Sequence, residues 1–182
     1  MADHVAAWRL GQKHFDYGTQ LQDRHPPLPR GLLIGESPSP NTNAELPLFP
    51  LPNNSAASRL VKYADIKPVE YLGRLVRMNL CDEEWSDRRA IVGYAKALSY
   101  LLDVKNFYDG KPLRVLLLGE RVARAWGCDG PFGYAERQSN PPGLCVAWIP
   151  HPSGRCHLYF ERKNQLRARR SMQWAIGERA AP

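Results

Sequence analysis

The 182-residue sequence has no apolar run that approaches the roughly 18 residues typical of a membrane-spanning helix. Its opening stretch, MADHVAAWRLGQKHF, has neither a continuous apolar core nor a basic leader, so we expect no signal peptide. The four cysteines stand far apart without a Cys-x-x-Cys pair, which is typical of reduced thiols. These absences predict a single cytoplasmic domain over residues 1–182, with no membrane partner.

Several common site patterns are also missing. LLLGERVARAWG lacks the Lys-Ser/Thr of a phosphate-binding loop. GESPS differs from the nucleophile elbow of hydrolases, because Ser39 replaces the last glycine and Pro38 removes an oxyanion-hole N–H. His151, Cys156 and His157 are metal-ligand types, but their spacing fits no common zinc pattern. We therefore expect no metal, and we keep a Ser/His hydrolase only as a minor alternative.

Positive charge is abundant and unevenly distributed. The formal net charge is +7 and the pI is about 9.4. From Gly154 onward there are seven Lys and Arg residues against two Glu residues. A basic segment of this kind predicts a polyanionic partner, most often nucleic acid. A basic protein without such a partner is the alternative.

Strand-like and helix-like segments alternate along the chain. Apolar runs predict buried strands, and longer amphipathic stretches predict helices that begin near Ser55 and near Ser86 or Asp87. The order predicts an α/β fold, a three-layer α/β/α arrangement with a central four-stranded parallel sheet. The predicted strands are 30–36, 73–80, 112–120 and 143–150, and the predicted helices are 4–15, 55–66, 86–103, 120–127 and 161–178.

Polar residues follow three of the predicted strands. Glu36-Ser37-Pro38 follows the first strand, Asn79 ends the second, and His151 follows the fourth. Ligands of parallel sheets bind beyond the carboxyl ends of the strands, so we expect these side chains to share one site. Pro150 and Pro152 restrict the backbone on both sides of His151 and favour a stiff, extended segment.

Four segments together resemble the uracil-DNA glycosylase superfamily over about residues 30–177. They are LLIGESPSPN, RLVRMNLCDEEWS, RVLLLGERVARAWG and HPSGR, in this order. The resemblance implies the fold of that superfamily. It also implies a monofunctional DNA glycosylase, which hydrolyses the N-glycosidic bond of a flipped uracil or modified pyrimidine and leaves an abasic site.

The resemblance assigns roles to the polar residues. His151 would donate to the pyrimidine oxygen on which negative charge develops. Glu36 would orient the attacking water, assisted by Ser37. Asn79 can pair bidentately with a pyrimidine edge. The predicted substrate-binding residues also include a stacking aromatic, Phe49 with Tyr63 as the fallback, together with Gly35 and Pro38.

The loop and helix after His151 are the expected DNA-binding surface. Arg155 can grip a phosphate or stack in the gap left by the base. The predicted DNA-binding residues are Ser153, Gly154, Arg155, Arg162, Lys163 and Arg167. The partner would be single- or double-stranded DNA, bound by a monomer.

The sequence departs from the superfamily in two respects. Cys81 stands where some members have an iron–sulfur ligand, but the other cysteines of that set are missing, so we expect no cofactor. Loop 37–54 differs as well, and Ser37 is a weak base at a position where other branches carry Asp or Asn. The substrate base, and a role in repair or against phage DNA, therefore stay open, as does a DNA-binding module without activity.

Overall fold

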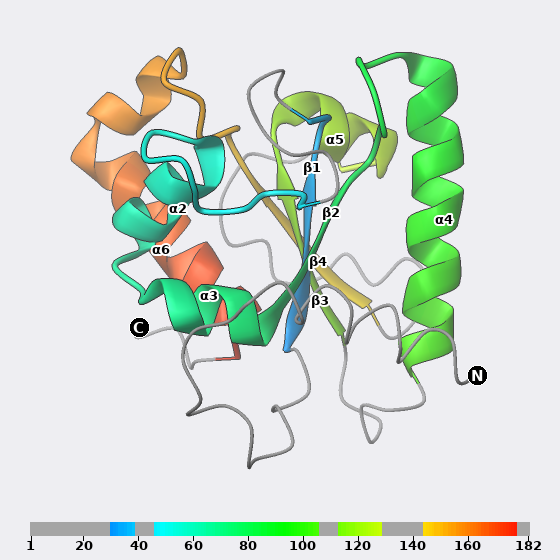
Figure 1. The fold of residues 1–182 in the computed structure, drawn as a ribbon, viewed down its shortest axis with the longest axis horizontal. Coiled ribbons are helices and arrows are strands. Elements are labelled where there is room, and N and C mark those ends of the chain that lie inside the picture. The colour runs from blue at the N-terminus through cyan, green and yellow to red at the C-terminus, as the bar shows by residue number, and fades with distance from the viewer. Residues whose placement is uncertain (1–29, 39–45, 106–112, 129–143, 178–182) are drawn as a thin grey trace.

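The computed structural model describes residues 30–38, 46–105, 113–128 and 144–177. Within these ranges four strands form one sheet in the order β2-β1-β3-β4, and every pairing is parallel (Figure 1). The predicted four-stranded parallel sheet is confirmed. The strands are β1 (Gly31–Gly35), β2 (Leu75–Asn79), β3 (Leu113–Leu118) and β4 (Leu144–Ile149).

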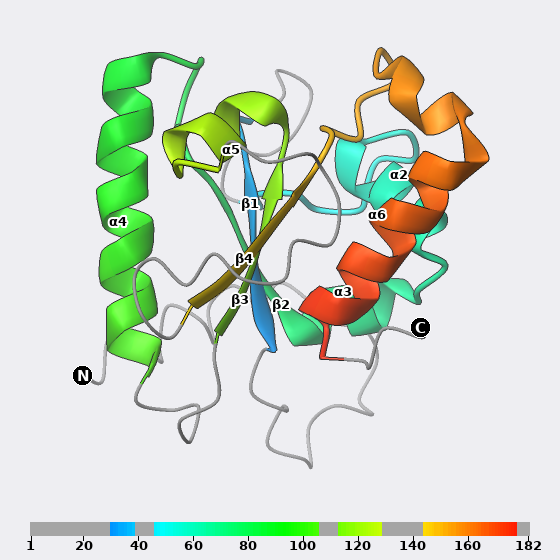
Figure 2. The ribbon, with the colours of Figure 1, turned by 180° about the vertical axis from the view of Figure 1, so that it is seen from behind.

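Helices cover both faces of this sheet. The views from the two sides agree that α2, α3 and α6 lie on one face, called the α2 face here, and that α4 lies on the other, called the α4 face (Figures 1 and 2). The three-layer prediction is therefore confirmed. The helices are α2 (Ala56–Ala64), α3 (Pro68–Arg74), α4 (Asp87–Lys105), α5 (Glu120–Ala125), the 3₁₀ turn η1 (His157–Phe160) and α6 (Arg162–Ala175). No helix in the described ranges is long and apolar enough to cross a membrane.

Alternation along the strands builds two apolar cores. On β1, Leu33 packs into the core of the α2 face, whereas Leu32 and Ile34 pack into the core of the α4 face. Successive side chains of a strand point to opposite faces, and here both faces are covered. The central strands therefore consist almost wholly of apolar residues, as the sequence pattern predicted.

Two helix starts predicted from the sequence are confirmed by their caps. Ser55 precedes α2, and its Oγ accepts a hydrogen bond from Ser58 N at 3.1 Å. Ser86 precedes α4, and its Oγ accepts from Arg89 N at 3.3 Å. Such caps satisfy backbone donors that have no partner inside the helix. The predicted helix 4–15 lies outside the described residues.

The start of the second predicted strand is wrong. Gly73 and Arg74 belong to α3, which the sequence analysis missed. Pro68 at the first helical position and Glu70, whose Oε2 accepts from Lys67 N at 3.4 Å, begin this short helix. The 3₁₀ turn η1 was missed as well, because four residues carry too little periodicity to reveal a turn of helix.

Candidate active site

The carboxyl ends of β1 and β2 place Gly35 opposite Asn79. The pairing continues past the strands, because Leu80 N donates to Gly35 O at 2.9 Å and Cys81 N donates to Glu36 O at 3.0 Å. The backbone that carries Glu36 is thus fixed against the end of β2. Two of the predicted site residues, Glu36 and Asn79, are brought to one edge of the sheet by this pairing.

Asn79 lies directly over Gly35. A Cβ atom built on Gly35 would come within 2.7 Å of Asn79 Oδ1 and 3.1 Å of Leu48 Cδ2, so only glycine leaves room for this side chain. Asn79 Oδ1 is buried and has no hydrogen-bond partner among the described residues. Leaving a buried acceptor unsatisfied costs about 1–3 kcal/mol. An N–H of a bound ligand would remove that cost.

The loop before α2 supplies Leu48 to this region, a residue that the sequence analysis missed. Leu48 has a φ of 53° and its carbonyl accepts from Tyr71 Oη at 2.8 Å. Phe49, the predicted stacking residue, is half-buried, and its carbonyl accepts from Ser55 Oγ at 3.2 Å. Its stacking role stays a prediction. Tyr63, the fallback, stacks on Tyr159 with ring centroids 4.8 Å apart and packs on the core of the α2 face.

His151 is held against the ends of β3 and β4. Gly119 N donates to Ile149 O at 2.8 Å, just before Pro150 turns the chain. Gly119 has a φ of 100°, which favours glycine, and a Cβ there would lie 3.3 Å from His151 Cβ. Ser153 N donates to His151 O at 2.8 Å and closes the loop behind the ring.

The surroundings of His151 keep its imidazole neutral. Burial lowers the pKa of His151 below its ordinary value of 6.5; the Glu36 carboxylate opposes this shift and the Arg59 guanidinium adds to it. At neutral pH the ring is therefore uncharged and can donate through one nitrogen. Arg59 comes from α2, and its guanidinium packs against Gly154 of the same loop. Arg59 was not foreseen from the sequence.

Glu36 is half-buried and ion-paired. Arg121 of α5 donates through Nη1 to Glu36 Oε1 at 3.0 Å. The pair engages one carboxylate oxygen and leaves Oε2 as a second acceptor. Ser37 and Pro38, which follow, are also half-buried. Arg121 lies far from Glu36 in the sequence, so only the sheet order reveals the pair.

The three polar side chains lie at or just beyond the ends of three of the four strands of the sheet. Asn79 stands at the end of β2, Glu36 at the end of β1, and His151 beyond β4, with β3 between. Three strand spacings of about 4.8 Å separate the backbones of β2 and β4 by about 14 Å. At this backbone separation Asn79 and His151 do not pair directly.

The predicted DNA-binding residues lie beyond His151, on the loop, η1 and α6. Ser153 is half-buried; the other five are exposed. Lys163 Nζ pairs with Glu161 Oε2 at 2.9 Å, and the neighbouring Arg169 pairs with Asp65 at 2.9 Å. The exposed members of the predicted set are Gly154, Arg155, Arg162, Lys163 and Arg167.

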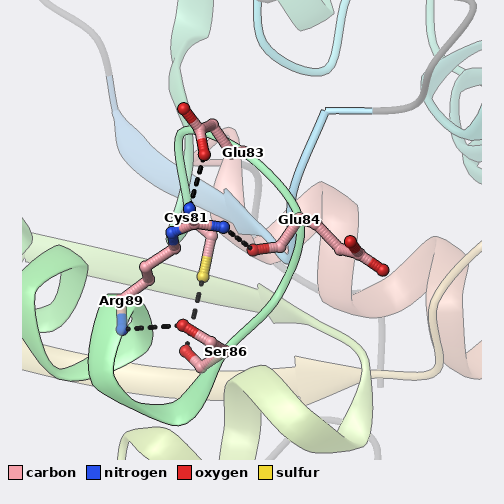
Figure 3. Close-up of polar contacts among 5 residues, drawn as sticks. All are labelled: Cys81, Glu83, Glu84, Ser86 and Arg89. Carbon is pink, nitrogen blue, oxygen red and sulfur yellow. Dashed lines mark hydrogen bonds and ion pairs between the residues drawn. The ribbon is translucent and has the colours of Figure 1, made fainter.

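A separate hollow of about 660 Å³ lies beside the β2–α4 loop. Arg89 bridges the carboxylate of Glu83 and, at 3.0 Å, the carbonyl of Glu84 (Figure 3). Cys81 is buried here, and its thiol lies 4.0 Å from the Ser86 carbonyl (Figure 3). No described residues form a group of three potential metal ligands. The contacts around Cys81 fit a role in packing this loop.

Comparisons with protein families and characterised proteins found no match for this chain. The functional argument therefore depends on the geometry of the strand ends and on the motifs themselves.

Proposed function

We propose that the protein is a DNA glycosylase that hydrolyses the N-glycosidic bond of a flipped pyrimidine. The observation that carries the proposal is the buried, unpartnered Oδ1 of Asn79, placed over Gly35 at the same sheet edge as Glu36 and His151. A carboxylate, an amide and a neutral imidazole at one edge provide an acceptor for water, a reader of a pyrimidine edge and a hydrogen-bond donor.

Asn79 would recognise the base. Its Oδ1 accepts from the ring N–H of uracil or a related imide, and its amide nitrogen donates to the adjacent carbonyl oxygen. A base that lacks the N–H leaves Oδ1 unsatisfied, so the site discriminates by the cost of a missing hydrogen bond. The base must leave its stack to reach this edge.

His151 and Glu36 would act on opposite sides of the bond that breaks. As the C1′–N1 bond lengthens, its electron pair moves onto the base and negative charge develops on a carbonyl oxygen. Neutral His151 donates a hydrogen bond to that oxygen. Glu36 Oε2 orients a water for attack on C1′ and accepts its proton, while Arg121 holds Oε1. The products are the free base and an abasic site.

Excision on oligonucleotides tests the proposal. Purified protein is incubated with single- and double-stranded oligonucleotides that contain uracil, hydroxymethylated or glycosylated pyrimidines, and alkali then cleaves any abasic site. We expect strand breaks with at least one of these bases. Glu36→Gln and His151→Ala should each slow excision about 100-fold or more, because each removes a group that acts on the bond.

Matched variants separate chemistry from surface effects. Glu84→Gln removes an exposed carboxylate from the β2–α4 loop and should leave the excision rate unchanged. Strand breaks at parental rates with Glu36→Gln and His151→Ala would remove both residues from the site. The Glu36–Arg121 pair and Ser37 favour the alternative, a DNA-binding module without activity, and binding with no excision of any base tested would establish that alternative.

A further inference from the structure

An aromatic surface lies exposed next to the predicted site, on η1. Phe160 is 74% exposed, the largest exposed fraction among the large hydrophobic side chains of the described residues. The His157 ring packs edge-on against Phe160, with centroids 5.4 Å apart and an interplanar angle of 66°. Leu158 between them is 44% exposed. We call His157, Leu158 and Phe160 the η1 platform.

The η1 platform is anchored, so its exposure does not come from a loose end. Tyr159, within the same turn, is only 1% exposed and donates through its hydroxyl to Pro150 O at 2.6 Å. Two side chains of α6 cap the turn from below: Asn164 Nδ2 donates to Leu158 O at 2.8 Å, and Gln165 Nε2 donates to Tyr159 O at 2.6 Å. The Tyr159 hydroxyl reaches the residue directly before His151. The platform is thereby fixed to the His151 loop.

The charge around the η1 platform is positive. Arg155 precedes the turn, and Arg162 and Lys163 follow it, all three exposed. Glu161 is the one acid among described residues 151–177, and it lies beside Lys163 Nζ and Asn164 Nδ2. In Figure 2 this segment, coloured orange, stands beyond the end of β4. His151 follows the same strand, which ends at Ile149. Exposed aromatic rings surrounded by cations are suited to bind a nucleic-acid strand, because the rings can stack on its bases and the cations can contact its phosphates.

We propose that the η1 platform stacks unpaired bases of single-stranded DNA, while Arg155, Arg162 and Lys163 contact its phosphates. This inference rests on the proposed function and deepens it, because it identifies single-stranded DNA as the form of substrate that brings a base to His151. Base–aromatic stacking needs an accessible π-face, which a single strand offers at every nucleotide and a duplex hides. A duplex would meet Phe160 with its sugar–phosphate surface, where an exposed apolar ring gains little.

Anisotropy titration of labelled oligonucleotides without any target base measures this interaction. We expect tighter binding of a single strand than of the matching duplex. Phe160→Ala should weaken single-strand binding roughly 5- to 100-fold, and Phe160→Trp should retain it. Phe160→Leu keeps apolar area but has no π-face, so it should behave like Phe160→Ala. Ile91→Ala, which removes another strongly exposed apolar side chain on α4, is the control and should change nothing.

Salt dependence separates stacking from phosphate contact. Arg155→Gln and Lys163→Gln should each reduce the slope of log affinity for single-stranded DNA against log salt by about 0.7, whereas Phe160→Ala should leave that slope unchanged. Equal or tighter binding of the duplex, or parental affinity for both Phe160→Ala and Phe160→Leu, would overturn the inference. Binding of poly-glutamate as tight as single-stranded DNA, with the same sensitivity to Phe160, would assign the platform to an acidic protein instead.

The two proposals fail in different ways. If single strands bind through Phe160 but no base is excised, the η1 platform stands and the glycosylase proposal falls. If excision occurs and Phe160→Ala changes neither kcat nor KM on single strands, the glycosylase proposal stands and the η1 platform proposal falls. When both are correct, Phe160→Ala raises KM on single strands and leaves kcat near the parental value, because the ring contacts flanking bases and not the reacting bond.

Discussion

Strand β2 and the β2–α4 loop that follows it differ in how their polar groups are paired. In the β2–α4 loop the charged groups pair with one another: Arg89 with Glu83, and Lys96 Nζ with Asp82 Oδ2 at 3.0 Å. On β2 itself, two residues of the α2 face, Arg77 and Asn79, hold buried polar atoms without a partner among the described residues. The hollow of about 660 Å³ belongs to the loop, whereas the buried polar atoms without a partner belong to the strand.

This contrast separates a structural region from a candidate binding region. Paired surface charges contribute little to stability and leave little capacity for a ligand. Unpartnered buried atoms cost free energy in the unbound protein, and a ligand that satisfies them recovers it. The other unpartnered buried atoms among the described residues are on Trp126, at the end of α5, and on Asn164 and Ser171, both in α6. Within the described sheet, Arg77 and Asn79 are the two such residues, and they share one face of β2 at or near its carboxyl end.

The largest expected effect comes from closing the space over Gly35. Gly35→Ala places a Cβ 2.7 Å from Asn79 Oδ1, so the amide must move. A displacement of about 1 Å can cost about 100-fold in rate, and we expect a loss of that size in excision. Gly73→Ala is the matched control, because nothing lies within 4 Å of its Cβ position. Equal excision rates for Gly35→Ala and the parent would show that Asn79 over Gly35 is not part of the binding region.

A comparison of Arg77 with Arg114 tests whether the buried Arg77 guanidinium, which lacks hydrogen-bond partners at Nε and Nη1 among the described residues, lowers the stability of the fold. Arg77 lies over the Tyr71 ring at 5.6 Å, and Arg114 lies over the Trp174 ring at 5.7 Å. Arg114 also donates to the Trp174 carbonyl, whereas Nε and Nη1 of Arg77 have no partner among the described residues. Burial lowers the pKa of Arg77, and the neighbouring Tyr71 opposes that shift.

The two methionine variants should therefore differ in their effect on the free energy of unfolding. Arg114→Met should lower the free energy of unfolding by about 1–2 kcal/mol, through the lost charged hydrogen bond. Arg77→Met should leave that free energy unchanged or raise it by about 1 kcal/mol, because it removes a desolvated charge without leaving an acid unpaired. Urea denaturation followed by tryptophan fluorescence measures both. A large loss with Arg77→Met would show that the cation stabilises the fold.

The β2–α4 loop should respond in stability alone. Ser86→Ala removes the oxygen that caps α4, which costs about 1 kcal/mol. Excision at a temperature where both proteins are folded should be unchanged. Ser99→Ala, an exposed position within α4, serves as the control and should not lower the melting temperature. A loss of excision by folded Ser86→Ala would connect this loop to the chemistry.

The smallest effect is a shift of the pH profile. Arg59 lowers the pKa of His151, so Arg59→Gln should raise it. Because the pKa of His151 in the parent lies below its ordinary value, excision by the parent should fall only as the pH drops through that lowered pKa. The variant should begin to lose activity at a higher pH than the parent. Lys62→Gln, on the same helix, should leave the acid limb in place. An NMR titration of the imidazole gives the pKa of His151 directly. Identical values in the parent and in Arg59→Gln would show that Arg59 does not lower this pKa.

Some of this architecture follows from sequence alone. Apolar runs with a helix between them predict buried parallel strands, and Ser55 and Ser86 mark helix starts, because these signals are local and involve residues within one or two turns. Glu36, Asn79 and His151 could be placed at strand ends for the same reason. Pro68 and Glu70 carry a local signal for α3 as well, although the sequence analysis predicted no element for residues 67–72.

Tertiary structure decided what depends on contacts between distant segments. The strand order β2-β1-β3-β4 brings Arg121 to Glu36 and puts Leu48 against Gly35. It also decides that Tyr159 turns into the core while Phe160 faces outward. Composition gives both aromatics the same apolar character, and only the packing of η1 on β4 and α6 distinguishes them. Local periodicity fixes the elements, whereas the partners of each side chain depend on which elements lie side by side.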